Sequence, residues 1–168
     1  MESKGFKRKL SAILSADVVG YSRLMGENEE ITIRSVNTYR KLITSLTEKH
    51  HGRVVDSPGD NLLAEFTSVI DAVRCAVEVQ EEIADRNAEI PGSQKMEYRI
   101  GINIGDVVDE EGRIYGDGVN IAARLESLFC QFPCVSFFLL GCSCDPNTRK
   151  CHVLRPSGTP HELSAPLF

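Results

Sequence analysis

The chain has 168 residues, of which 42% are apolar and 26% are charged, and its net charge at pH 7 is −5. These values are ordinary for a globular protein of about one domain, which can bury a core without disulfides or a structural metal. The negative charge argues against electrostatic binding of nucleic acid. We expect no membrane-spanning helix, because no run of 18 apolar residues occurs. The N-terminal segment lacks a secretory cleavage pattern, which predicts a cytoplasmic protein.

The first predicted elements are a strand and a long helix. Residues 10–17 alternate in polarity, which predicts a half-buried strand with Leu10 on its buried face and Asp17 at its end. Apolar residues at helical spacing predict one helix over residues 27–51, and Gly52 fits the stop that follows it.

A hairpin and a second helix come next. Residues 53–66 predict two short strands joined by a Pro-Gly-Asp-Asn turn, which contains Asp60. Thr67 or Ser68 is expected to cap the next helix. Its buried stripe is predicted from its apolar residues: Val69, Val73, Ala76, Val77, Ile83 and Ala84. Cys75 lies on the same helix and is expected in the core.

The last regular elements are a strand over residues 96–108 and a helix over residues 117–128. Gly101 and Gly105 within that strand are interpreted as sites of close backbone approach. The order strand, helix, hairpin, helix, strand, helix predicts an α+β fold with a ferredoxin-like sheet and helices on one face.

The composition changes sharply near residue 128. Residues 128–168 contain five charged residues, five of the six cysteines, five of the seven prolines and five of the seven phenylalanines. A change of this kind is typical of a boundary between segments of different origin. We therefore expect a domain at residues 9–127 and a separate, unassigned Cys/Phe/Pro-rich tail at residues 128–168.

Two carboxylates stand out by position. Asp17 ends an apolar strand, and Asp60 lies in the turn of the hairpin. If the hairpin pairs beside the first strand, the two side chains come together, and such oxygen ligands suit Mg²⁺ beside a substrate phosphate. The alternative is that Asp60 is present only because aspartate is common in such turns, and that Asp17 is simply exposed to solvent.

Four sequence strings together resemble a class III adenylate/guanylate cyclase domain of the bacterial type. The resemblance covers roughly residues 9–127 and implies conversion of ATP or GTP to a 3′,5′-cyclic nucleotide and pyrophosphate for intracellular signalling. The strings are ADVVGYSRLMG (16–26), RVVDSPGDNLLAEF (53–66), RIGINIGDVV (99–108) and IYGDGVNIAARLES (114–127).

The resemblance implies a role for each residue of a two-metal site. Asp17 and Asp60 would bind two Mg²⁺ or Mn²⁺ ions, assisted by the backbone carbonyl of Val18. Asn120 would orient the ribose, and Arg124, one helical turn later, would stabilise the charged transition state. In the family, the metal ligands and the Asn–Arg pair come from different copies, which implies a homodimer. Without the other motifs, Arg124 would be interpreted as an ordinary surface residue.

Two positions depart from the adenylate cyclase pattern. The residue that is usually a base-reading Lys is Asp56, and its usual Asp or Thr partner is Arg113. Asp56 could accept hydrogen bonds from guanine N1–H and N2–H₂ or from adenine N6–H₂, and Arg113 could donate to guanine O6 or N7. The alternative is that the two residues form a salt bridge or face solvent.

The tail carries no recognised family motif, although the family continues beyond this point with further strands and a helix. The simplest hypothesis is a truncated or frameshifted coding sequence after about residue 127. Zinc binding by the tail cysteines and His152 is an alternative. The resulting rival to an active cyclase is a catalytically impaired pseudo-cyclase that binds nucleotide or dimerises without turnover, and a second rival is a degenerate product without a stable fold.

Overall fold

A computed structural model describes residues 7–110, 112–128, 135–137, 141–145, 150–154 and 160–161. The helices are α1 (Tyr21–Glu27), α2 (Glu29–Lys49), α3 (Val69–Ala88), the short 3₁₀ helix η1 (Gly92–Gln94) and α4 (Asp117–Leu128). The strands of the main sheet are β1 (Lys7–Val18), β2 (Arg53–Asp56), β3 (Leu62–Phe66), β4 (Tyr98–Glu110), β5 (Arg113–Tyr115) and β6 (Val135–Phe137). Strands β7 (Gly141–Asp145), β8 (Lys150–Leu154) and β9 (Pro160–His161) form a separate small sheet.

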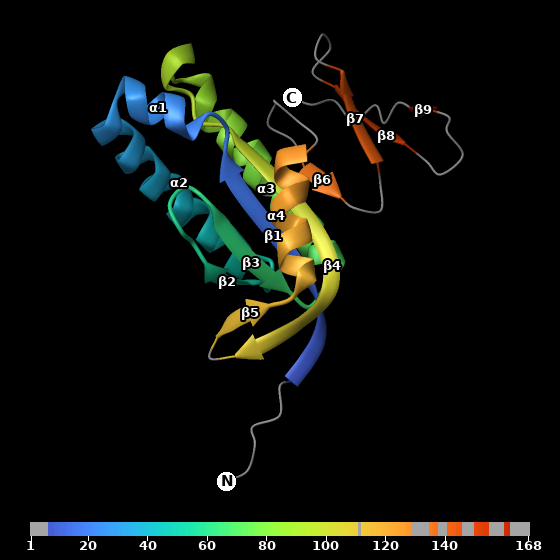
Figure 1. The fold of residues 1–168 in the computed structure, drawn as a ribbon. Helices are drawn as coiled ribbons and strands as arrows, with labels where there is room; N and C mark the ends of the chain where they lie inside the picture. The colour runs from blue at the N-terminus through green and yellow to red at the C-terminus, as the bar shows by residue number, and fades with distance from the viewer. Residues whose placement is uncertain are drawn as a thin grey trace.

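The main sheet has the order β2-β3-β1-β4-β5 among the described strands (Figure 1). These neighbours are all antiparallel, and β6 pairs with β4 in parallel. The long central strands β1 and β4 pair over their whole shared length, from Lys7 opposite Asp109 to Val18 opposite Tyr98. This α+β sheet confirms the predicted fold class.

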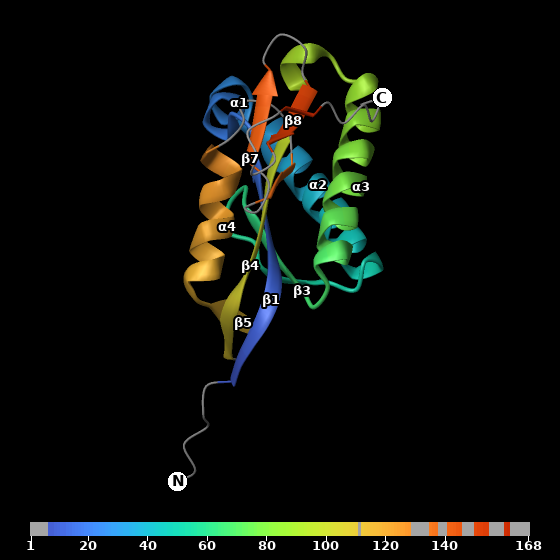
Figure 2. The same cartoon turned by 90° about the vertical axis from the view of Figure 1, so that its right-hand side faces the viewer.

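Helices cover both faces of the sheet, so the expectation of helices on one face is wrong (Figure 2). The even-numbered residues of β1 from Ala12 to Val18 belong to the large core under α2 and α3, whereas Ile13 packs on the opposite face with Ala122 and Val119 of α4. Alternating strand side chains point to opposite faces, and the odd-numbered face of β1 has a single apolar side chain, Ile13, among polar residues. One apolar residue does not predict burial of that face, so the alternation in β1 predicts helices on the other face only.

The predicted helix over residues 27–51 is two helices. Gly20, with φ at +68°, allows α1 to begin directly after β1. Asn28 then interrupts the helical run, and its side chain accepts a hydrogen bond of 3.0 Å from the Ile31 amide as the N-cap of α2. Ser68 caps α3 in the same way through the Asp71 amide, as predicted.

The buried stripe of α3 differs from the predicted one. Val73 and Val77 are 36% and 46% exposed, and Ala84 is also exposed. Ala76 and Ile83 are buried as predicted, and Ala72, Cys75 and Val79 are buried beside them. The helix carries two apolar stripes at helical spacing, and small side chains allow the closer approach to the sheet. Burial of Cys75 is confirmed.

The predicted burial of Leu10 is wrong. Its side chain is 68% exposed, because the first residues of β1 extend beyond the helices that cover the rest of the strand (Figure 2).

A polar network ties four strands together on the α4 face of the sheet. Its centre is Glu65 of β3, which is only 5% exposed and accepts a 2.6 Å hydrogen bond from the Ser11 hydroxyl. Lys9 and Arg53 each pair with both Glu65 and Asp109, at nitrogen–oxygen distances of 2.6–2.9 Å. A buried carboxylate satisfied on all sides fixes the strand register.

This network predicts a pH-dependent contribution to stability. Burial alone would raise the pKa of Glu65, but hydrogen bonds from Lys9, Ser11 and Arg53, and the Arg53 charge, hold it below the ordinary 4.5. We therefore expect Glu65→Gln to lower the free energy of unfolding at pH 7 by about 2–3 kcal/mol. Because the folded-state pKa is lowered, this contribution is present above pH 4.5 and is lost as the pH falls through the folded value.

Urea unfolding of the wild type and Glu65→Gln across this pH range measures the effect, with the exposed Glu81→Gln on α3 as the matched control. A constant difference between wild type and Glu65→Gln at pH 7 and pH 3.5 would contradict the assignment.

No described helix is long and apolar enough to span a membrane. Side chains of residues 126–168 lie outside the described part, so the zinc hypothesis for the tail cysteines and His152 falls outside it as well.

Candidate active site

Asp17 lies next to the last residue of β1, where the chain leaves the sheet. Its side chain is 19% exposed. Being odd-numbered, it points to the same face of the sheet as α4. Val18 follows with a buried side chain, and the chain then turns through Gly20 into α1. The role of the Val18 carbonyl stays a prediction.

Asp60 lies in the turn between β2 and β3, as predicted. β3 pairs with β1 in a register that puts Leu62 opposite Ala16, so the turn stands beside the end of β1. The Asp60 carboxyl comes within hydrogen-bonding reach of Asp17. The two carboxylates that the sequence singled out are therefore together in the structure.

The contact between the two carboxyl groups has an electrostatic consequence. Burial, followed by the hydrogen bond and the negative charge of Asp17, raises the pKa of Asp60 above its ordinary 3.8, while a backbone hydrogen bond and the Arg99 charge act in the other direction. A site in which two carboxylates repel each other gains stability from a cation. Hard oxygen donors of this kind fit Mg²⁺ or Mn²⁺, with phosphate oxygens and water completing the shell.

Arg99 of β4 is a residue of this site that the sequence interpretation missed. It stands directly opposite Asp17 in the β1–β4 register, and its guanidinium pairs with the Asp17 carboxylate. Its Nε is a buried nitrogen without a hydrogen-bond partner in the described part of the chain. The available signal was an arginine within an apolar strand, which indicates a buried anion.

Asn120 and Arg124 lie one turn apart on α4, and both are exposed. The face that α4 turns to its own sheet carries Ala122 and Leu125, which are buried. The pair thus shares one exposed helix face, as predicted.

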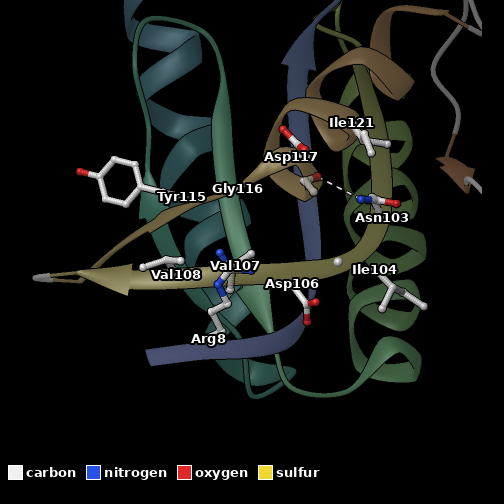
Figure 3. Close-up of a pocket in the computed structure, with 12 residues that line it drawn as sticks. Arg8, Asn103, Ile104, Asp106, Val107, Val108, Tyr115, Gly116, Asp117 and Ile121 are labelled. Atoms are coloured by element: carbon white, nitrogen blue, oxygen red, sulfur yellow. Dashed lines mark hydrogen bonds between the residues drawn. The ribbon is translucent and has the colours of Figure 1, made fainter. Parts of the chain in front are cut away.

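Close backbone contact sets the position of α4. A Cβ on Gly105 would lie 3.0 Å from the Gly118 Cα, and one on Gly118 would lie 3.0 Å from the Ile13 side chain. The buried Asn103 side chain donates a 3.1 Å hydrogen bond to the Gly118 carbonyl (Figure 3). The predicted close approach at Gly105 is confirmed, and it holds the first turn of α4 against β4.

Asp56 and Arg113 are both exposed, at the end of β2 and the start of β5. The Asp56 carboxylate accepts a 2.9 Å hydrogen bond from the Ser57 amide next to it. No ion pair joins Asp56 to Arg113 among the described residues, so the salt-bridge alternative finds no support.

A cavity of about 450 Å³ lies at the start of α4, away from the carboxylate pair. Its lining includes Arg8, Asp106, Tyr115 and Asp117 (Figure 3). None of the predicted site residues lines it. The carboxylate pair at the end of β1 and in the β2–β3 turn thus lies outside this cavity.

Comparison with known proteins identifies the family of this chain. Residues 7–131 match the family described as "Adenylate and Guanylate cyclase catalytic domain". The chain is 40% identical over 129 residues to "Putative adenylate cyclase 3" of Rhizobium meliloti, covering 76% of this chain and 22% of that protein. The chain thus spans about a fifth of the length of this relative.

Solved structures give the same result. An adenylate/guanylate cyclase/hydrolase from Silicibacter pomeroyi matches with a TM-score of 0.69 and 45% identity, covering 74% of this chain and 73% of that one. The guanylyl cyclase Cya2 matches with a TM-score of 0.63 and 28% identity, covering 72% of each chain. Together with the four motifs and the sheet that carries them, the match over residues 7–131 shows that this chain belongs to the family of class III adenylate and guanylate cyclase catalytic domains, a family of lyases.

Proposed function

We propose that the chain is a metal-dependent nucleotide cyclase domain that converts a purine nucleoside triphosphate, by resemblance ATP, to its 3′,5′-cyclic monophosphate and pyrophosphate. The observation that carries the proposal is the contact between Asp17 and Asp60 at the end of β1, beside Arg99, in a chain of the cyclase family. Such a protein would work in the cytoplasm, where its substrate and Mg²⁺ are abundant.

In this proposal, Asp17 and Asp60 hold two Mg²⁺ or Mn²⁺ ions, assisted by the Val18 carbonyl. The ions supply Lewis-acid charge next to the ribose 3′-hydroxyl and the phosphates. The two carboxylates would act by holding these cations where the charge of the α-phosphate is neutralised, because phosphoryl transfer depends chiefly on positioning and charge stabilisation.

Asn120 and Arg124 complete the proposed site from a second copy of the chain. Their position supports this arrangement, because both side chains are exposed on α4, on the side turned away from their own sheet. Asn120 orients the ribose, and the planar guanidinium of Arg124 spreads over the developing charge on the phosphate oxygens. A homodimer follows, because one copy alone presents only half of the site to each substrate.

The proposal predicts a role for Asp56 in base selection. Guanine offers Asp56 two donors, N1–H and N2–H₂, whereas adenine offers only N6–H₂. We therefore expect Asp56→Ala to lower GTP turnover about 2- to 10-fold more than ATP turnover, since one additional lost hydrogen bond costs about 0.5–1.5 kcal/mol. Measurement of kcat/KM for both nucleotides with Mn²⁺ checks this. An unchanged ratio would remove Asp56 and its partner Arg113 from the base site.

A pseudo-cyclase is the second candidate, and the changed pair Asp56 and Arg113 is the observation that favours it. Incubation of the purified chain with ATP or GTP and Mg²⁺ or Mn²⁺ separates the two, with Asp17→Ala as the control. Cyclic nucleotide that disappears in Asp17→Ala supports the cyclase. Metal-dependent nucleotide binding without product supports the pseudo-cyclase.

A further inference from the structure

The turn that carries Asp60 is held in place from two sides. Within the turn, the Asn61 amide donates a 3.0 Å hydrogen bond to the Pro58 carbonyl, and the Ser57 hydroxyl donates a 3.1 Å hydrogen bond to the Asn61 carbonyl. On the sheet side, the Asn61 side-chain amide donates to the Ser15 hydroxyl at 3.2 Å. Ser15 is two residues before Asp17 and shares its face of β1, so this bond links the turn to the strand that carries the first carboxylate.

A second contact that holds this turn comes from helix α2. Arg40 of α2 donates a hydrogen bond from Nη2 to the Gly59 carbonyl, directly before Asp60. Its Nη1 donates to the Asn37 side chain at 3.0 Å, which fixes the guanidinium on the helix surface. Gly59 has φ at +59°, a left-handed conformation that glycine adopts at little cost and that gives the chain its sharp turn before Asp60. The Arg40 hydrogen bond holds this turn from outside.

Both contacts involve residues next to the two carboxylates: Gly59 precedes Asp60, and Ser15 lies two residues before Asp17. Buried Tyr98 is 2% exposed, and burial raises its pKa, with the Arg40 charge acting against the charges of Asp60 and Asp17. Arg40, Asp60 and Asp17 therefore all lie near this phenol, and the Arg40 hydrogen bond goes to the backbone beside Asp60.

We propose that Arg40 is a positioning residue of the metal site: by holding the Gly59 carbonyl, it fixes the Asp60 turn beside the end of β1 and so sets the spacing of the two carboxylates. The expected effect on metal binding rests on the proposed function. The contact itself is a property of the metal-free chain, so it is testable separately. Arg40 touches neither substrate nor metal in this assignment.

Two substitutions of Arg40 test its contact with the Gly59 carbonyl. Arg40→Met keeps the aliphatic stem and removes the donor, and Arg40→Lys keeps the charge with a single ammonium donor. Arg34→Met is the matched control, because Arg34 lies on the same helix, is 77% exposed and pairs with Glu30 rather than with the turn. If Arg40→Met fails to fold, Arg40→Lys serves in its place, because a single ammonium group cannot reproduce the paired hydrogen bonds of the guanidinium to Asn37 and to the Gly59 carbonyl.

The first measurement is amide hydrogen exchange of residues 57–61 in metal-free protein. We expect exchange of the Asn61 amide to accelerate in Arg40→Met, because its bond to Pro58 depends on a closed turn, and to stay at the wild-type rate in Arg34→Met. Equal exchange in the wild type and Arg40→Met would overturn the proposal.

The second measurement is Mn²⁺ binding, followed by the electron paramagnetic resonance of free Mn²⁺ with a 3′-deoxynucleoside triphosphate present. We expect about tenfold weaker binding in Arg40→Met, the usual effect of losing a group that orients a ligand. Arg40→Lys should recover part of it. In turnover assays, Arg40→Met should raise the Mn²⁺ concentration needed for the half-maximal rate. Saturating Mn²⁺ should restore kcat.

The outcomes separate the two proposals. If the wild type binds no more Mn²⁺ than Asp17→Ala, the metal site and the proposed function fail together, and hydrogen exchange alone decides whether Arg40 holds the turn. If the wild type binds Mn²⁺ and Arg40→Met binds it equally well, only the positioning role fails. An equal loss in Arg34→Met would show a general effect of α2 and would also overturn the proposal.

Discussion

Replacing Asp60 with asparagine is expected to abolish cyclase activity and, in metal-free buffer at pH 7, to raise the melting temperature. The loss of activity should be on the order of 10³-fold, since a cation contributes several kcal/mol to the transition state. The gain in stability has a different cause. Asp60 lies against Asp17, and its pKa is raised by burial and by that neighbour, so ionising it at neutral pH costs folding free energy that the neutral amide does not.

The sign of this effect fixes its pH dependence. A group whose pKa is raised in the folded state contributes stability below its unfolded pKa, here 3.8, and loses that contribution as the pH rises through the folded value. The advantage of Asp60→Asn over the wild type should therefore be full at pH 7 and should shrink as the pH falls towards 3.8.

Asp17→Asn should behave oppositely in stability although it is equally inactive. It removes the anion that pairs with Arg99, a guanidinium that is only 24% exposed. Loss of a hydrogen bond to a charged group costs about 1.5–3 kcal/mol, and each kcal/mol lowers the Tm of a domain this size by about 2–4 °C. Two carboxylates with the same proposed role thus differ in the sign of their effect on folding.

Thermal unfolding followed by circular dichroism, with a chelator present, measures both variants. Asp85→Asn on the exposed face of α3 is the matched control and should leave the Tm unchanged. A fall in Tm for Asp60→Asn would contradict the repulsion between the two carboxylates. Full activity of either site variant would contradict the metal site.

Mixing two inactive variants is expected to restore activity if the site is shared between copies. Asp60→Asn removes the metal half of the proposed site, and Arg124→Ala removes the half that binds the transition state, at a cost of about 10²–10³-fold. In a two-fold symmetric dimer with random exchange, half of the dimers are mixed and each mixed dimer has one intact site, so about a quarter of wild-type activity returns.

The measurement is cyclic nucleotide formation by each variant alone and by the mixture after subunit exchange. A mixture of Asp60→Asn with Asp17→Ala is the control, because both changes fall in the same half of the site and no intact site can form. Activity in that control, or none in the first mixture, would contradict a site built from two copies. Sedimentation of the wild type gives the oligomeric state independently.

The sequence alone determined the parts of this protein that depend on local pattern. Alternation in β1, the Pro-Gly-Asp-Asn turn and the Ser68 cap are short-range signals, and they located the elements and placed Asp17 and Asp60 at their ends. The proximity of the two carboxylates followed only as a consequence of pairing the hairpin beside the first strand, and the β1–β3 register confirms that pairing. The motif spacing was specific enough to identify the family.

Only the tertiary structure decided the rest. Arg99 meets Asp17 across 82 positions of sequence, and Arg40 meets Gly59 across 19, through a strand register and a helix packing that no local pattern encodes. Which apolar stripe of α3 is buried, and which face of the sheet α4 covers, likewise depended on how closely backbones could approach, as at Gly105 and Gly118. Local polarity fixes which residues prefer burial, whereas the partner that each one meets is set by packing over the whole chain.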